Sequence, residues 1–381
     1  MKLLIAADIF PPESGGPATY AVTLANELVK QMIGVTIVSL NPDGERISRN
    51  TYHVTHRNKI LRYAQYFFLL FKHAKHSDIV YAMGTVNAGL PAWLAARLRG
   101  KKFVVKVVGD YAWEQGQVRF GVTDSIDEFQ KQFSKYPFFV QLLKKIESFV
   151  VRHTNQVIVP SKYLANIVKG WGTKEEKVKV IYNAVEFKEV VPATKPASEK
   201  WIISVARLVP WKGMATLIEI MPAISKEFPK ARLKIIGDGP EMLKLVSLIA
   251  VLNLGDIVEL LGQLPHEKTL SYIKSADIFL LNSAYEGLSH VILEALSYLK
   301  PILASDVGGN RESVIPQHTG DRFAFDDKGE IKKMILVYLQ GQPYVSYKEK
   351  PPIVIQSRLS NMIENTKSAL AELINQSTNN Q

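Results

Sequence analysis

The chain has 381 residues, 47% of them hydrophobic, and a formal net charge of +11 at pH 7. Its length predicts two domains, because single hydrophobic cores stop growing beyond roughly 250–300 residues. The absence of cysteine excludes a disulfide framework, a thiol nucleophile and a cysteine metal site, and it fits a reducing, cytoplasmic compartment. No apolar run approaches the roughly 18–20 residues of a membrane span, and MKLLIAADIF is typical of a first strand rather than a signal peptide.

The excess of positive charge lies in the first half of the chain. Residues 1–185 carry 25 Lys and Arg against 14 Asp and Glu, whereas the remaining residues carry 22 of each. This asymmetry favours an anionic surface or substrate for the first half alone. A basic surface that serves only solubility is the alternative.

Apolar runs of strand length alternate with segments of helical period along the first half. The alternation predicts parallel βαβ units. The clearest helices between the strands are expected at 19–32 and 89–100. The Val- and Ile-rich runs predict buried strands at 2–8, 35–40, 78–83, 102–110 and 156–160.

The pattern stops at residues 180–200, which have no helical period and contain two prolines, and we interpret them as a linker. It then resumes, with strands expected at 201–208, 231–240, 257–262, 277–283 and 301–306. These halves predict an α/β fold of two Rossmann-like domains, 1–185 and 200–355, and a last helix, 356–381, that can cross back to the first domain. Ligands bind at the carboxyl ends of the strands in such sheets, so the expected site is the cleft in which the domains face each other.

A glycine pair opens the first helix, in the loop ADIFPPESGGPATYA. Gly15 and Gly16 let the backbone approach a ligand closely, and the helix N-terminus behind them favours an anion. The loop lacks the G-x-G-x-x-G pattern, which disfavours NAD. A tight turn that needs glycine only for steric reasons is the alternative.

Three loops of the second half have features that favour anions. Arg207 and Lys212 follow one expected strand, and their charges suit a diphosphate. Gly237 and Gly239 form a glycine turn after the next strand. The N–H groups from Ser289 onward begin a helix, where they can face an anion.

Two acids flank that last loop. Glu286 and Glu294 lie eight positions apart in LNSAYEGLSHVILEA, with Gly287 directly after the first. Eight residues are a little over two helical turns, which predicts both carboxylates near one face of a helix. Two solvated surface glutamates are the alternative.

The motifs SGGPATY, ARLVPWKG, IIGDGPE, YEGLSHVILEA and ILASDVGGNRE, in this order, resemble the family 4 retaining glycosyltransferases (glycosyl transferases group 1) of the GT-B fold. The resemblance covers most of the chain and is densest at 200–325. It implies that Glu286 lies by the transferred sugar as a catalytic residue and that Glu294 binds the ribose hydroxyls of a nucleotide. The expected donor-binding residues are Gly15, Gly16, Arg207, Lys212, Gly237, Gly239, Gly287, Leu288, Ser289 and Glu294.

The expected chemistry needs no cofactor other than the nucleotide-sugar substrate. Cleavage of a sugar–phosphate bond leaves negative charge on the diphosphate, which Arg207, Lys212 and the helix N-terminus after Glu286 can stabilise. The sequence has no Asp-x-Asp at a strand end, so we expect no metal. The resemblance implies front-face attack in which the donor phosphate deprotonates the acceptor, without a protein base.

The first half is expected to bind the acceptor. Asp110 ends an expected strand where many family members have an acid or a histidine, so it is the second candidate catalytic residue; a turn-capping role is the alternative. Tyr111 and Trp113 can stack on a sugar or simply pack. The turn at Gly262 is expected to pass the nucleotide base, and His290 is given no catalytic role.

The expected reaction moves a hexose-type sugar from a nucleotide-diphosphate sugar, UDP favoured over GDP, to a lipid-linked saccharide or glycolipid. Alternatives are a soluble acceptor, a nucleotide-sugar epimerase, or a non-catalytic sugar- or lipid-binding scaffold; nucleic acid is not among the expected partners. Aromatic residues with basic flanks at 56–76 predict a helix at an anionic membrane surface, on the inner face of the cell membrane. Packing of that helix on the sheet explains part of its apolar content.

Overall fold

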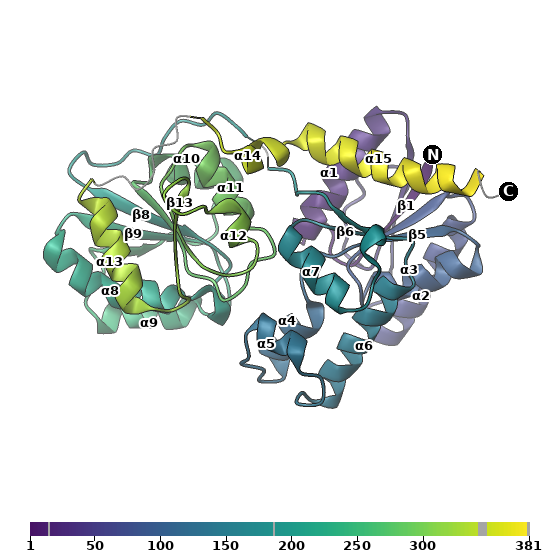
Figure 1. Ribbon diagram of the computed structural model, residues 1–381, viewed down its shortest axis with the longest axis horizontal. Coiled ribbons are helices and arrows are strands. Elements are labelled where there is room, and N and C mark those ends of the chain that lie inside the picture. Colours follow the sequence, from purple (N-terminus) through teal and green to yellow (C-terminus); the bar gives the residue numbers. More distant parts are fainter. Residues whose placement is uncertain (14–15, 186, 342–348, 379–381) are drawn as a thin grey trace. The chain divides into compact units, whose positions relative to one another are not determined.

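The computed structural model describes residues 1–13, 16–185, 187–341 and 349–378, which divide into two units (Figure 1). Unit 1 comprises Met1–Ala184 and Leu359–Gln381, and unit 2 comprises Val185–Arg358. Each unit contains a parallel sheet with helices packed on it. The predicted class of two Rossmann-like α/β domains is therefore confirmed.

The sheet of unit 1 has seven parallel strands in the order β3-β2-β1-β4-β5-β6-β7. The strand order reverses between the adjacent strands β1 and β4. The connections that follow these two strands therefore run in opposite directions from their carboxyl ends, and sheets of this kind bind ligands at such a point. The strands are β1 (Lys2–Ala7), β2 (Gly34–Ser39), β3 (Thr51–His53), β4 (Ile79–Met83), β5 (Lys102–Lys106), β6 (Gln156–Val159) and β7 (Val178–Val180).

Helices cover both faces of this sheet. Buried side chains of α1 and α15 share one hydrophobic core with β1, β2 and β4, whereas α2 and α3 pack on the opposite side of the same strands. The helices of unit 1 are α1 (Gly16–Lys30), α2 (Lys59–Ala74), α3 (Gly89–Leu98), α4 (Tyr111–Arg119), α5 (Ile126–Lys131), α6 (Phe138–Arg152), α7 (Lys162–Gly170), the 3₁₀ turn η1 (Glu175–Lys177) and α15 (Leu359–Thr378).

Unit 2 repeats the design with six parallel strands in the order β10-β9-β8-β11-β12-β13. The strands are β8 (Lys200–Val205), β9 (Ala231–Ile236), β10 (Val258–Leu260), β11 (Ile278–Leu281), β12 (Ile302–Ser305) and β13 (Gly320–Phe323). The helices are η2 (Pro210–Lys212), α8 (Met214–Glu227), α9 (Met242–Val251), α10 (His266–Ser275), α11 (His290–Ser297), α12 (Asn310–Ser313), α13 (Lys328–Leu339) and α14 (Pro352–Gln356). Helices α8, α9 and α13 share a core with one face of the sheet, and α10 and α11 pack on strands from the other side.

The last helix packs on the first unit, beside α1 (Figure 1). Met362, Ile363, Ala369, Leu370 and Leu373 are buried in the core that α15 shares with β1 and α1. Their spacing of three, four and seven residues places them on one stripe of the helix. Hydrophobic burial along this stripe therefore holds the end of the chain on unit 1.

Much of the stretch predicted as a linker packs on unit 2. The carbonyl of Lys188 accepts a hydrogen bond from the Tyr298 hydroxyl, at 2.5 Å. The Ala193 N–H donates to the carbonyl of Ser271 at 3.1 Å, and the Ser275 hydroxyl donates to the Ala193 carbonyl at 2.9 Å. Residues 181–185 and 187–199 lie in no helix or strand, yet these bonds attach the second of these ranges to α10 and to the end of α11.

A lysine without a hydrogen-bond partner is buried in the core of unit 1. Lys106 ends β5, its side chain is 1% exposed, and its Nζ lies 3.7 Å from the centre of the Tyr20 ring. No described residue accepts a hydrogen bond from this ammonium group. Burial lowers the pKa of Lys106 to about 7, because desolvation disfavours the charged form.

Replacement of Lys106 by Met is expected to raise the free energy of unfolding by about 1–4 kcal/mol at pH 7, because it removes a buried, unpaired charge. The unfolded chain holds the Lys106 proton up to its ordinary pKa, whereas the folded chain releases it near pH 7. Between these values the unfolded state binds more protons, so the stability of the parent rises with pH. The difference in the free energy of unfolding between the Met variant and the parent should therefore shrink from pH 7 to pH 10, as urea titrations can measure. A difference that does not change with pH would contradict this prediction.

Candidate functional site

Loops at the carboxyl edge of the unit 2 sheet are joined through their backbones. The Leu208 N–H donates to the carbonyl of Asp238 at 2.9 Å, which joins the loops after β8 and β9. Gly237 has a φ of +137°, and a Cβ there would lie 1.9 Å from the Ala206 carbonyl oxygen. A Cβ at Gly239 would lie 2.3 Å from the Leu208 carbonyl oxygen. Both predicted glycines thus allow two loops to touch, and any contact they make with a donor stays a prediction.

Asn282, directly after β11, fixes the start of helix α8. Its buried side-chain amide donates to the carbonyl of Gly213 at 3.1 Å and to Asp326 Oδ1 at 2.7 Å. The Asp326 N–H donates in return to Asn282 Oδ1 at 3.1 Å. Gly213 follows Lys212, so this buried amide sets the position of the loop that carries the predicted diphosphate-binding lysine.

Lys212 and Glu286 form an ion pair at this edge of the sheet. The two side chains are 16% and 12% exposed, so the pair is largely shielded from water but can still be reached. The Ser283 hydroxyl donates a second hydrogen bond to the same carboxylate oxygen of Glu286, at 2.8 Å. The side chain of Arg207 is exposed, and no described residue pairs with it.

The prediction that both glutamates lie on one helix face is wrong. Helix α11 begins at His290, so Glu294 lies on the helix and Glu286 lies in the loop before it. The Glu286 carbonyl accepts a hydrogen bond from the Gly309 N–H at 2.8 Å, and a Cβ at Gly309 would lie 2.2 Å from the Gly287 carbonyl oxygen. This contact with the loop after β12 holds the segment through Gly287 in a non-helical path.

The start of α11 has the features expected for an anion site. Ser289 is the N-cap residue, and its side chain accepts no hydrogen bond from the first turn. The first-turn N–H groups of a helix lack intrahelical partners, and the helix dipole favours negative charge there. Leu288 and Ser289 are buried, so their predicted contacts with a donor would come from the backbone.

Glu294 contacts a histidine that the sequence motifs did not indicate. Its Oε1 lies 2.8 Å from Nε2 of His266, the first residue of α10. Glu294 is 8% exposed, which excludes the alternative of a solvated surface glutamate. The signal for His266 was its place at the start of a helix, four residues after the predicted turn at Gly262, but sequence spacing does not bring it to Glu294.

In unit 1, Asp110 caps helix α4 from a buried position. Its Oδ1 accepts a hydrogen bond from the Trp113 N–H at 2.7 Å, its Oδ2 accepts one from Gln130 Nε2 at 2.6 Å, and the residue is 1% exposed. The capping role stated as the alternative is thus present, and the catalytic role stays a prediction. Trp113 is fully buried and packs, whereas Tyr111 is partly exposed.

A second acid lies close to Asp110. The buried carboxylate of Glu147 accepts hydrogen bonds from the Tyr111 N–H at 2.9 Å and the Thr85 hydroxyl at 3.2 Å. Burial, and then the charge of Asp110, raise the pKa of Glu147 well above its ordinary value. Of the predicted glycine pair, Gly16 begins α1, and Gly15 lies outside the described residues.

Two family models together match nearly the whole chain. The model for glycosyl transferases group 1 matches residues 186–351, and the model for Glycosyltransferase Family 4 matches residues 14–189. The chain belongs to the family 4 glycosyltransferases.

Curated relatives of this glycosyltransferase match over part of its length. A component of the phosphatidylinositol N-acetylglucosaminyltransferase of Arabidopsis thaliana is 33% identical over 177 residues, which are 46% of this chain and 39% of the relative. The lipopolysaccharide 1,6-galactosyltransferase of Escherichia coli K12 is 27% identical over 184 residues, 47% of this chain and 51% of the relative. The matches thus span only about two-fifths to half of these relatives.

Solved structures show the fold of this glycosyltransferase over its whole length. Anabaena HepE in complex with UDP and glucose has a TM-score of 0.76 at 18% identity, and it covers 98% of this chain and 100% of its own. The apo form of the lipopolysaccharide outer core galactosyltransferase WaaB has a TM-score of 0.73 at 18% identity, with 98% and 99% coverage. Within the described residues, no helix combines the length and apolar character needed to cross a bilayer, and no three His, Asp or Glu side chains could hold a metal together.

Proposed function

We propose that this glycosyltransferase moves a hexose-type sugar from a nucleotide-diphosphate sugar to a hydroxyl of a lipid-linked saccharide or glycolipid, with retention of configuration. The observation that carries the proposal is the Lys212–Glu286 pair at the carboxyl edge of the unit 2 sheet, between loops that are joined by backbone hydrogen bonds. A cation for a leaving diphosphate and an acid for a sugar thus lie in contact. UDP is favoured as the nucleotide because Anabaena HepE, which has the same fold, binds UDP.

The reaction breaks the bond between the anomeric carbon and the donor phosphate oxygen, and it forms a bond from that carbon to the acceptor oxygen. Positive charge develops at the anomeric carbon, where the Glu286 carboxylate can stabilise it. Negative charge develops on the leaving diphosphate, which Lys212, Arg207 and the N-terminus of α11 stabilise. The acceptor proton passes to the leaving phosphate oxygen, so the scheme needs no protein base and no metal.

The acceptor class follows from the relatives. One relative is named for phosphatidylinositol, which is a membrane phospholipid, and another for lipopolysaccharide, which is a lipid-linked saccharide. Such acceptors lie at a membrane surface, so we place the enzyme at the inner face of the cell membrane. The basic excess of residues 1–185 supports this location.

The test is incubation of the protein with labelled UDP- and GDP-sugars, with and without glycolipid acceptors, in excess chelator. Transfer should occur from one donor, need the acceptor and persist in chelator, and NMR should show a product with the anomeric configuration of the donor. Epimerisation of a donor without acceptor would establish the alternative enzyme class. Transfer only to water-soluble sugars would overturn the glycolipid acceptor while leaving the donor chemistry in place.

Glu294→Ala is expected to weaken UDP and donor binding about tenfold, because it removes a charged hydrogen-bond acceptor from the ribose. Turnover at saturating donor should stay near that of the parent. Calorimetry with UDP measures the first effect and initial rates measure the second. His266→Ala is the matched variant, since it leaves the carboxylate in place but removes its 2.8 Å partner. Equal UDP affinity for Glu294→Ala and the parent would contradict the assignment.

A further inference from the structure

The connection between β5 and β6 of unit 1 leaves a cluster of large apolar side chains in solvent. This connection contains the helices α4, α5 and α6. At the start of α6, the side chains of Phe138 and Phe139 are 72% and 61% exposed. Leu142 lies one turn further along the helix, and Phe133 lies just before it; both are exposed as well. We call Phe133, Phe138, Phe139 and Leu142 the apolar tip.

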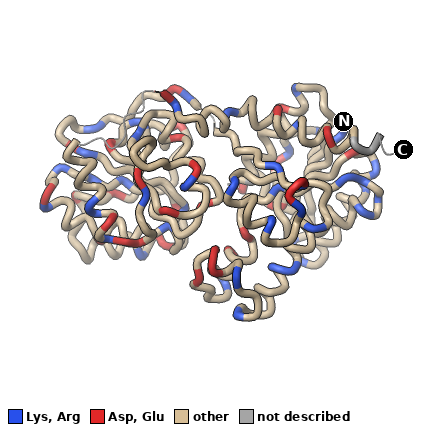
Figure 2. The backbone as a smooth tube through the Cα atoms, in the orientation of Figure 1, with Lys and Arg blue, Asp and Glu red and all other residues tan. Residues whose placement is uncertain are grey.

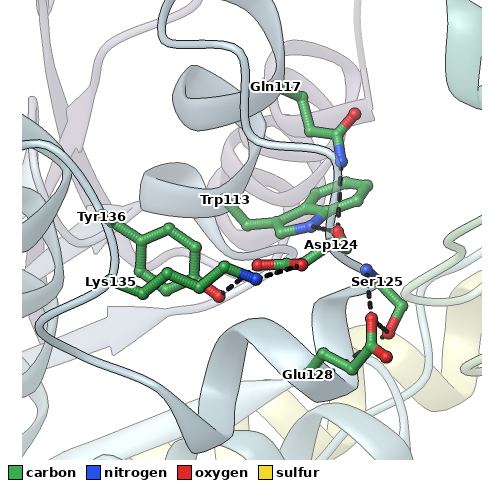
Figure 3. Close-up of polar contacts among 7 residues, drawn as sticks. All are labelled: Trp113, Gln117, Asp124, Ser125, Glu128, Lys135 and Tyr136. Atoms are coloured by element: carbon green, nitrogen blue, oxygen red, sulfur yellow. Dashed lines mark hydrogen bonds and ion pairs between the residues drawn. The ribbon is translucent and has the colours of Figure 1, made fainter.

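The apolar tip extends from a firmly held segment. Figure 3 shows Asp124 at its centre: the carboxylate accepts hydrogen bonds from Lys135 Nζ and the Tyr136 hydroxyl, both at 2.8 Å. The Asp124 carbonyl accepts a third from the indole N–H of Trp113 at 3.0 Å. Ser125 and Glu128 form a capping box that starts α5. These bonds fix the backbone on both sides of Phe133, so its exposure is a feature of the fold.

A lysine of α6 holds the end of α5 from the other side. Lys144 donates hydrogen bonds to the carbonyls of Phe129 and Gln132, the latter at 2.7 Å. Its Nζ also lies 3.9 Å from the centre of the Phe129 ring. Phe129 is buried and Phe133, two residues after the end of α5, is exposed. The ring of Phe129 is thus packed in the protein, whereas the ring of Phe133 lies in solvent.

The surroundings of the apolar tip are basic. Residues 129–146 contain four lysines and no acid, and Lys131, Lys135 and Lys145 are exposed. Figure 2 shows Lys and Arg segments at the lower end of this region, while its exposed acids lie on α5. Lys135 is paired with Asp124, and Lys131 shares α5 with the exposed acids Asp127 and Glu128, so Lys145 carries most of the unbalanced charge.

We propose that the apolar tip and these lysines dock unit 1 on the surface of an anionic lipid bilayer. Exposed aromatic side chains beside lysines match the interface of a membrane, where rings enter the headgroup region and ammonium groups contact lipid phosphates. The inference deepens the proposed function by naming the docking surface, and it rests on that function only in expecting a lipid-linked acceptor. The tip lies in the same unit as Asp110 and the predicted acceptor side.

Helix α2, which its sequence pattern predicted to lie at the membrane, gives a comparison within the same unit. Its Tyr66, Leu70 and Ala74 are buried against the sheet, and the Arg99 guanidinium covers the Phe71 ring at 3.6 Å. Packing thus explains much of its apolar content. Ile60 and Phe68 remain exposed on α2, so variants at these residues are a matched control.

The experiment is sedimentation of the full chain with neutral phosphatidylcholine vesicles and with vesicles rich in phosphatidylglycerol. The parent should bind only the anionic vesicles, and binding should fall with salt. Phe138→Ser with Phe139→Ser, and separately Lys131→Ser with Lys145→Ser, should each raise the lipid concentration needed for half-binding at least tenfold. Ile60→Ser with Phe68→Ser should bind like the parent.

Equal binding by the parent and both tip variants would overturn the proposal, as would loss of binding in the α2 variant alone. A parent that binds neither vesicle type also overturns it; if that parent forms a dimer that the Phe138 and Phe139 changes dissociate, the tip is a contact between copies. UDP affinity, measured by calorimetry in solution, should be the same in all variants. That readout separates failure of docking from failure of the donor site, and thermal melting followed by circular dichroism shows whether the variants fold.

Discussion

Glu286→Gln is expected to lower turnover about 100-fold at saturating donor, while UDP binds nearly as in the parent. The change removes the negative charge that we propose faces the anomeric carbon, and it breaks a largely buried ion pair with Lys212. Breaking such a pair typically costs about 3–5 kcal/mol, and part of that cost falls on the reacting state. Initial rates at saturating donor measure the loss, and calorimetry with UDP measures binding.

Glu259→Gln is the matched control for this variant. Glu259 on β10 also pairs with a lysine, Lys234 on β9, but its side chain is 52% exposed. An exposed pair contributes little to stability, so both turnover and UDP binding should be unchanged. Parental turnover by the Glu286→Gln enzyme would remove Glu286 from the mechanism.

Lys212→Ala should weaken nucleoside diphosphate and intact donor alike, by roughly 10- to 100-fold. The ammonium group is the one predicted diphosphate ligand that the structure holds in contact with Glu286. Loss of a hydrogen bond to a charged group costs about 1.5–3 kcal/mol. Titration calorimetry with UDP and with the donor measures the effect.

Uridine supplies the control for the lysine variant, because it lacks phosphates and should bind equally to parent and variant. Lys234→Ala removes a lysine from the same unit without touching the loop after β8, so its UDP affinity should be that of the parent. Unchanged UDP affinity in Lys212→Ala would show that this lysine serves only to hold Glu286.

The sheets could be predicted from the sequence because each central strand is buried on both faces. Such strands form nearly continuous runs of Val, Ile, Leu and Ala, as in β1 and β4. These runs can be recognised in the sequence without knowing which strands pair with each other. The short edge strand β3 was missed, since its three residues carry no such run. The arrangement of α4, α5 and α6 was also not predicted. It depends on side-chain hydrogen bonds between loops and helices, such as those that Asp124 accepts from Lys135 and Trp113, and no sequence periodicity indicates these bonds.

The site was predictable in its composition and less so in its geometry. Lys212 and Glu286 could be named from motifs, but their contact depends on the register of β8 and β11. The one-helix interpretation of Glu286 and Glu294 failed because Gly309, in a loop farther along the chain, holds the segment through Gly287 away from the helix. His266 was missed for the same reason, since only the fold brings it to Glu294.

Helix α15 affects the order in which this protein can be completed on the ribosome. It covers part of the core of unit 1 with residues that are translated after all of unit 2. A nascent chain that ends before Leu359 would therefore lack the apolar stripe of α15, and the core that this stripe shares with α1 and β1 would stay incomplete. Unit 2 can close its core as soon as its own strands emerge, whereas the core of unit 1 is completed only after all of unit 2 has been translated.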